Sequence, residues 1–163
     1  MEPITKAALL GSLIANDCWI IHLYAKGDKF DDLHNLAEKY YLTVSSQTDY
    51  LMELAVEMDK LIVNPSEALK YIPNYIIENS VEYTWEPSLE IFQHKLGTFI
   101  GALKEVRASI DRADVQSWID DNVRDLEKEV HYRLVRRSES RPNMLNGFVS
   151  TGLDNHIAYT TSR

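Results

Sequence analysis

Four side chains that can bind a metal ion recur along one stretch of the chain. His34 and Glu38 are four residues apart, and so are Asp49 and Glu53. Residues four apart share a face of a helix, and the 15 residues from His34 to Asp49 are close to a whole number of turns. If this stretch is one helix, all four side chains therefore lie roughly along one line.

One straight helix cannot bring the two pairs to a single ion. At about 1.5 Å per residue, His34 and Asp49 lie more than about 20 Å apart along the axis. The pairs meet only if two copies of the helix pack antiparallel about a two-fold axis, which gives two identical sites per dimer. His22, at the end of the preceding helix, can approach His34 within the same chain.

Two imidazoles and up to three carboxylates form a mixed nitrogen and oxygen ligand set. Such a set suits iron(II), and manganese or zinc could compete for it. Carboxylates also stabilise iron(III), and a site without thiols and with open positions allows oxidation by dioxygen or peroxide. Each residue taken alone is more often part of a solvated helix face, so the combination supports the metal site.

Four long amphipathic helices and one short helix are predicted to position these residues. Apolar residues recur at spacings of three and four through each long segment, and those of the first include Trp19 and Leu23. The long helices are expected at 5–26, 31–62, 87–110 and 114–137, and the short helix at 67–71.

Side chains that favour helix ends mark these boundaries. The candidate caps are Asp31 or Asp32, Ser66 and Asp114, and the predicted stops are Gly27-Asp28 and Asn64-Pro65. The connection between the second and third long helices is long, and that between the third and fourth is short. The sequence therefore predicts an all-α four-helix bundle over residues 1–137 with one long crossover. The polar tail, 138–163, is expected to be mobile or to pack on a neighbouring subunit.

The bulk composition excludes several classes of protein. No run of about 18 apolar residues is present, so we expect no membrane span, and the N-terminus lacks the pattern of a secretory signal. The single cysteine, Cys18, excludes an intramolecular disulfide framework, fits a reducing cytoplasm and is expected in the core. The net charge of −8 argues against a broad basic surface for nucleic acid and fits a protein that attracts cations.

The stretch from His22 to Glu53 resembles the signature of the Dps-type miniferritins, a family of the ferritin-like superfamily. Its members have a histidine, a glycine a few residues later, an aromatic residue before a second histidine, an acidic residue four further on, and an Asp-x-x-x-Glu pair. The pattern lies on this chain without a gap, at His22, Gly27, Phe30, His34, Glu38, Asp49 and Glu53. With the four helices, the similarity extends over about residues 5–137.

The resemblance implies a ferritin-like bundle, a hollow shell of twelve subunits, and a ferroxidase centre at the dimer interface. It implies that iron(II) is oxidised there by hydrogen peroxide or dioxygen, and that the iron is then stored as mineral, which limits oxidative stress. One subunit would supply His22, His34 and Glu38, and its mate Asp49 and Glu53. Pores near the start of the fourth helix would be acidic, with Asp111, Asp114, Asp120, Asp121 and Asp125 as candidates.

The chain departs from the family pattern in several respects. Many members have tryptophan directly after the first histidine, where this chain has Leu23, with Trp19 one turn earlier. That difference leaves open which aromatic residue protects the site from radicals. The Glu-x-x-His pairs of larger ferritins are absent, because pairs such as Glu90 and His94 are spaced at four. This spacing disfavours a di-iron centre within one subunit.

Three other functions stay open. One is a DNA-compacting shell with a weak metal site, since DNA binding is the family's second activity. It is disfavoured because the tail is only mildly basic and the N-terminus offers only Lys6. A second is a non-catalytic helical interaction protein whose polar stripe is solvated. A third is a reservoir for zinc or manganese without redox chemistry.

Overall fold

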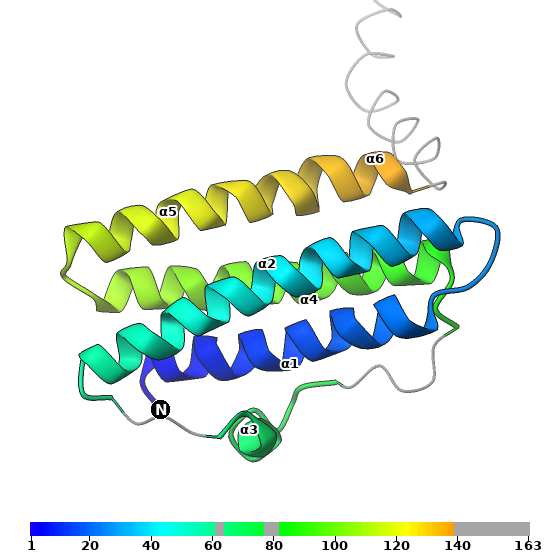
Figure 1. Cartoon of the computed structure of the whole chain (residues 1–163). Coiled ribbons are helices and arrows are strands. Elements are labelled where there is room, and N and C mark those ends of the chain that lie inside the picture. The colour runs from blue at the N-terminus through cyan, green and yellow to red at the C-terminus, as the bar shows by residue number, and fades with distance from the viewer. Residues whose placement is uncertain (61–63, 77–81, 139–163) are drawn as a thin grey trace, which may run out of the picture.

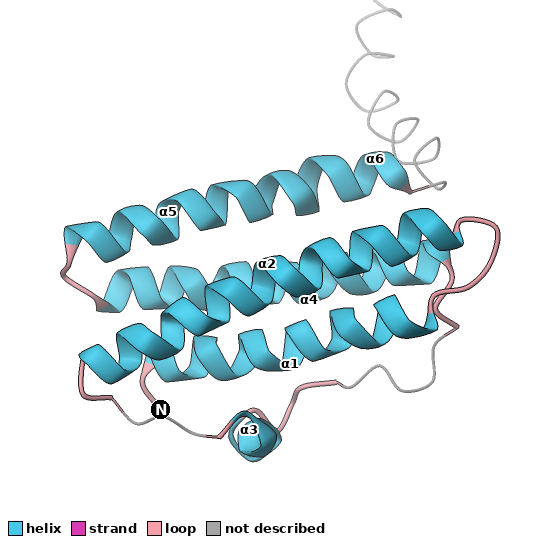
Figure 2. Cartoon of the chain, viewed as in Figure 1, coloured by secondary structure: helices cyan, strands magenta, loops and turns pink. Residues whose placement is uncertain are grey.

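The computed structural model describes residues 1–60, 64–76 and 82–138, and all regular secondary structure within these ranges is helical (Figure 2). The prediction of an all-α chain is confirmed. Four long helices lie side by side (Figure 1). They are α1 (Pro3–Tyr24), α2 (Phe30–Glu57), α4 (Trp85–Ser109) and α5 (Ala113–Lys128). After α5 the chain continues through a π-helical turn, η2 (Glu129–Leu134), into α6 (Val135–Arg137).

Short loops join α1 to α2 and α4 to α5, so the helices of each pair run antiparallel (Figure 1). A long connection leads from α2 to α4 and contains the short helices η1 (Pro65–Glu67) and α3 (Ala68–Tyr71), which lie against α1. It returns the chain to the end at which α2 began, so α2 and α4 run parallel (Figure 1). The predicted short helix is therefore confirmed.

Two of the predicted caps on the long helices are wrong. Asp31 and Asp32 lie inside the first turn of α2, whose N-cap is Lys29. Asp114 lies inside the first turn of α5, whose N-cap is Arg112, and its carboxylate binds the Arg112 guanidinium at 2.7 Å. Acidic side chains in a first turn still favour the helix, because they face the positive end of its dipole.

The predicted cap of the short helix is also wrong. Ser66 lies within η1, and its backbone N–H and its hydroxyl both donate to the Asn64 side-chain oxygen, at 3.0 and 2.9 Å. Asn64, predicted to end α2, instead starts the next helix, because its short side chain can accept from the backbone two residues on.

α2 ends earlier than predicted, and the predicted end near Ile62 lies outside the described residues. Asp59 adopts the left-handed conformation, with φ of 55°. Its N–H donates to the Val56 carbonyl at 3.0 Å, and the Lys60 N–H donates to the Ala55 carbonyl at 2.9 Å. These two bonds form a Schellman motif, which satisfies the last carbonyls without help from a proline.

One hydrophobic core fills the space between the long helices. The predicted inward residues of α4 are all buried, namely Leu89, Phe92, Leu96, Phe99, Leu103 and Val106. Cys18 is buried as predicted, and burial raises the pKa of its thiol. Gly11 lets α1 approach α2 closely, because a Cβ there would overlap the Thr48 side chain.

The apolar residues of α1 do not all lie in the core. Trp19 and Leu23, which belong to the apolar pattern of this helix, are 43% and 51% exposed. Because α1 is apolar on nearly every side, periodicity could not identify its buried face. Its length and hydropathy alone would suit a membrane span, and 67% of its most apolar 18-residue window is buried in the structure. Buried core helices and signal sequences share that composition.

A buried ion pair attaches the long connection to the helices. Asp17 of α1 and Lys95 of α4 are 5% and 4% exposed, and their charged atoms are 3.1 Å apart. The Tyr75 hydroxyl donates to Asp17 at 2.5 Å, and Lys95 stands 3.9 Å from the Tyr75 ring and donates to the Ile76 carbonyl. Buried charges are tolerated only when paired and hydrogen-bonded, so α1, α4 and the connection stabilise one another.

Replacing Asp59 by glycine is expected to raise the free energy of unfolding by about 0.5–1 kcal/mol, because glycine adopts the left-handed conformation without a steric penalty. Asp59→Ala is the matched control. It is expected to lower the free energy of unfolding, because the Cβ of alanine makes the left-handed conformation sterically unfavourable. Urea denaturation at pH 7 measures both. Identical midpoints for the two variants would show that the end of α2 does not depend on this motif.

Candidate metal centre

The loop between α1 and α2 places His22 and His34 side by side. Gly27 makes the reversal possible, since its φ of 97° lies in the region that favours glycine. The Lys26 N–H donates to the Tyr83 carbonyl at 3.0 Å, which holds the loop against the residues that precede α4. The two histidines, twelve residues apart in sequence, thus come from the facing ends of α1 and α2.

The two imidazole rings are stacked, with centroids 3.8 Å apart and an interplanar angle of 27°. Nδ1 of His34 lies 2.9 Å from the His22 carbonyl oxygen, and Nδ1 of His22 lies 3.3 Å from the His34 carbonyl oxygen. A carbonyl only accepts, so each Nδ1 carries the proton that it donates, and in a neutral ring Nε2 then keeps its lone pair. Metal-binding histidines are usually oriented by such a bond from the other nitrogen.

The three predicted carboxylates do not join this pair within one chain. Glu38, Asp49 and Glu53 are exposed and make no hydrogen bond or ion pair among the described residues. α2 is one unbroken helix, so Asp49 lies about 22 Å from His34 along its axis. In the described part of the chain, no three His, Cys, Asp or Glu side chains lie close enough together to hold a metal ion.

An open depression of about 450 Å³ lies between α1 and α2, and Trp19, Tyr41, Ser45 and Asp49 line it. Large apolar side chains are exposed around it, and by helical spacing they lie on the same side of α1 and α2. We call this surface the α1–α2 face, and its exposed apolar residues are Trp19, Leu23, Leu42 and Val56, from 43% to 63% exposed. An apolar patch beside free carboxylates is typical of a contact with another chain.

Most of the acidic residues proposed for a pore are already paired within the chain. Asp114 binds Arg112, Asp120 binds Arg107 at 2.6 Å, and Asp121 binds Arg124 at 2.8 Å. All three pairs are exposed. The hydrogen bonds from arginine hold the pKa of Asp114 and of Asp120 below the usual range. The side chains of Asp111 and Asp125 make no hydrogen bond or salt bridge in the described ranges.

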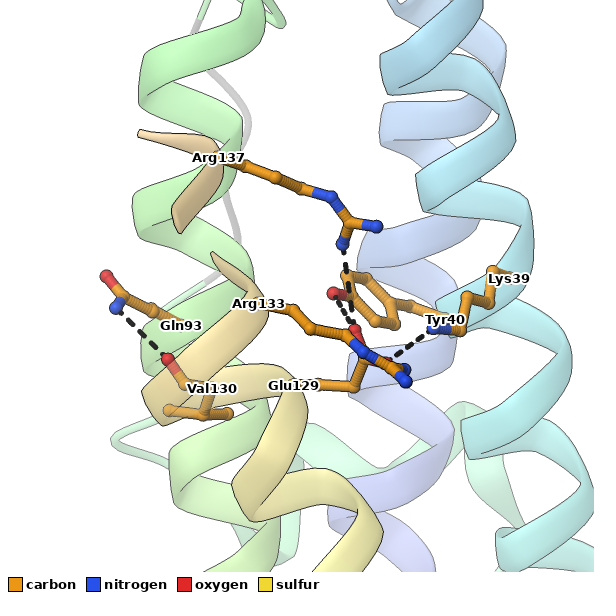
Figure 3. A network of polar contacts seen from close by, with 7 residues as sticks. All are labelled: Lys39, Tyr40, Gln93, Glu129, Val130, Arg133 and Arg137. Carbon is orange, nitrogen blue, oxygen red and sulfur yellow. Dashed lines mark hydrogen bonds and ion pairs between the residues drawn. The ribbon is translucent and has the colours of Figure 1, made fainter. Parts of the chain in front are cut away.

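The sequence did not predict a second polar site, which surrounds Glu129 (Figure 3). Glu129 is 6% exposed, and it accepts hydrogen bonds from Lys39 at 2.6 Å, from Tyr40 at 2.9 Å and from Arg133. Burial raises the pKa of Glu129, but these bonds outweigh it and hold the pKa below its usual range. One signal was present, because Glu129 follows the inward Leu126 by three residues and so falls on the buried stripe.

Comparison with known proteins identifies no relative: no family model matches the chain, and neither a curated protein nor a solved structure matches it. The resemblance to the Dps-type miniferritins therefore depends on the residues of this chain alone.

Of the predicted tail, the structure describes only Ser138, whose hydroxyl donates to Glu86 at 2.9 Å. The other tail residues lie outside the described ranges.

Replacing His22 by phenylalanine is expected to preserve the ring stack on His34 while removing one metal ligand. Cobalt(II) affinity, measured from the visible absorbance of the bound ion, should fall by at least about tenfold. His94→Phe is the matched control, because His94 is exposed on α4 outside the pair, and it should bind cobalt as the unaltered chain does. Equal affinities of the two variants would place the metal elsewhere.

Proposed function

We propose that this chain oxidises and stores iron as a Dps-type miniferritin, at a site that two subunits share. The observation that supports this proposal most strongly is the His22–His34 pair, in which each Nδ1 is bound to a backbone carbonyl and each Nε2 is left for a metal ion. Two nitrogen ligands are too few for a tight site, so the carboxylates have to come from a second chain.

The spacing along α2 supports a two-fold arrangement. His34 and Glu53 have the same midpoint as Glu38 and Asp49, between Thr43 and Val44. If a two-fold axis passes there, His34 faces the partner's Glu53 and Glu38 faces the partner's Asp49. Leu42, which is 57% exposed, then meets the small side chain of the partner's Ser45 near the axis. The contact would bury the apolar part of the α1–α2 face.

Iron(II) is the substrate of the proposed reaction. The imidazoles of one subunit bind it, and the carboxylates of the other favour the iron(III) product, which prefers oxygen ligands. Two iron(II) ions each give one electron to hydrogen peroxide, whose O–O bond breaks and which takes up two protons to leave two water molecules. Dioxygen is the alternative oxidant. Zinc and manganese would compete for the same ligands.

Other features agree with a ferritin-like shell. One long crossover between two antiparallel helix pairs is the ferritin-like four-helix arrangement. The net charge of −8 attracts cations toward the protein. Trp19 lines the same depression as Asp49, so an aromatic side chain would stand beside the shared site. We propose a cytoplasmic shell of twelve such subunits.

Asp49→Ala combined with Glu53→Ala is expected to abolish the acceleration of iron(II) oxidation over buffer, followed by the absorbance of iron(III) with peroxide as oxidant. Glu57→Ala combined with Asp59→Gly is the matched control, because it removes two exposed acids from the same end of α2 and glycine adopts the left-handed conformation of residue 59 without a steric penalty. Loss of activity in the control as well would show that iron oxidation depends on the overall negative charge of this end of α2 and not on Asp49 and Glu53 as metal ligands.

Mixed dimers test whether the site is shared. Co-expression of His34→Ala chains with Asp49→Ala, Glu53→Ala chains should restore about a quarter of the activity, because half of randomly formed dimers are mixed and each mixed dimer has one intact site. A site within one subunit predicts no recovery, since neither chain then has all ligands. The inactive parent variants, assayed separately, set the baseline.

Leu42→Glu is expected to separate the subunits, because it places like charges near the two-fold axis and removes an apolar contact. Particle mass from light scattering should fall below that of a shell of 18.8 kDa chains, and iron oxidation should be lost with it. Leu69→Glu, a change of the same type on α3 at a residue that is 42% exposed, should leave both unchanged. A Leu42→Glu chain of unaltered mass would contradict this dimer.

A further inference from the structure

Phe30, the first residue of α2, packs its ring against the ring of His34. The two residues are one turn apart on the same side of the helix, and their ring centroids are 5.3 Å apart with an interplanar angle of 31°. Side chains of a helix lean toward its N-terminus, so the His34 imidazole leans toward the turn that begins with Phe30. The order of residues in α2 therefore brings an aromatic ring to one of the two candidate nitrogen ligands.

Two kinds of contact act on the His34 imidazole. Its Nδ1 donates to the His22 carbonyl at 2.9 Å, and the rings of His22 and Phe30 both pack against it. The torsion next to a histidine ring is broad, so a hydrogen bond from one nitrogen leaves the ring plane free to tilt. Packing by neighbouring rings restricts that tilt, because aromatic rings prefer particular relative orientations. Nε2 of His34 then has one direction before any metal ion arrives.

The position of Phe30 is poorly suited to a purely structural role. Its side chain is 42% exposed, whereas Leu33, three residues later, is fully buried. A hydrophobic staple at the start of a helix joins the residue before the N-cap to the fourth helical residue. With Lys29 as the N-cap of α2, these two residues are Asp28 and Leu33, so Phe30 belongs to no staple. Among the aromatic rings of the described residues, Phe30 contacts that of His34.

The α1–α2 loop fixes the place of Phe30 as well as that of the histidines. The Phe30 N–H donates to the carbonyl of Gly27 at 3.1 Å, and Gly27 is the residue whose positive φ reverses the chain. The same turn therefore sets the first residue of α2 and brings His22 against His34. The three rings form one unit, with the ring of His34 in contact with both of the others.

We propose that Phe30 is a positioning residue of the candidate metal centre. Its ring holds the His34 imidazole with Nδ1 on the His22 carbonyl and with Nε2 directed at the metal ion. This inference rests on the proposed function, because it concerns the same ligands. A ring that is fixed in advance loses little freedom when an ion binds, and fixing one side chain raises affinity by about two- to tenfold.

The tautomer of His34 tests this role without a metal ion. NMR spectra of the ring nitrogens of the full chain, at about pH 8.5, where imidazole is neutral, should show one tautomer with the proton on Nδ1. Phe30→Ala should give a mixture of both tautomers, and Phe30→Tyr, which keeps the ring, should restore the single one. Tyr24→Ala is the matched control, because Tyr24 is an aromatic residue at the end of α1 that is 63% exposed. A single tautomer in Phe30→Ala, or a mixture in Tyr24→Ala, would overturn the proposal.

Cobalt(II) affinity tests the consequence for metal binding. Followed by the visible absorbance of the bound ion, Phe30→Ala should bind cobalt about two- to tenfold more weakly than the unaltered chain, whereas Phe30→Tyr and Tyr24→Ala should bind it equally well. Equal affinities of the two alanine variants would contradict the positioning role. If the unaltered chain failed to accelerate iron oxidation while both changes in Phe30→Ala were observed, the proposed function would be wrong and the role of Phe30 in holding His34 would stand.

Discussion

The rigidity of α2 is the constraint on which the proposed site depends. A continuous helix keeps its side chains at fixed axial separations, so no rotamer change brings Asp49 to His34 in one chain. The α1–α2 loop, by contrast, brings two residues of different helices together and holds His22 against His34 at ring-stacking distance. A single chain therefore presents a nitrogen half-site and an oxygen half-site at opposite ends of one face. Leu42 is exposed between them and would be buried in the proposed dimer.

Much of the fold could be predicted from the sequence, because the long helices α2, α4 and α5 have strong apolar periodicity. The inward residues of α4, from Leu89 to Val106, are buried as expected. The errors concern the ends of the helices, where local hydrogen bonds determine which residue begins or ends the helix. Asp59 ends α2 by taking a conformation that glycine usually takes, and Asp114, which pairs with Arg112, lies inside the first turn of α5 rather than at its N-cap. α1 is apolar all round, so its exposed side could not be identified from spacing.

The candidate site was predictable in part, since the spacing of His34, Glu38, Asp49 and Glu53 is a property of sequence alone. Whether the carboxylates meet the histidines is a question about two chains, which periodicity within one chain cannot answer. The bonds from each Nδ1 to a carbonyl depend on the geometry of the loop and could not be foreseen. The Glu129 network was missed for a related reason: its cations come from α2, η2 and α6, and the π-helical turn that positions two of its members has no known signature in composition.

The Asp17–Lys95 pair has a consequence for the order in which the chain assembles. Asp17 sits in the most apolar helix, and the groups that neutralise it, Lys95 and Tyr75, are made much later during synthesis. The α1–α2 hairpin emerging from a ribosome therefore has an ionised group on its future inner side, which opposes premature collapse. Docking of α4 and the crossover removes that penalty in one step. We accordingly expect that α1 and α2 do not pack stably together before α4 docks, and that folding of the helical region is a single cooperative transition.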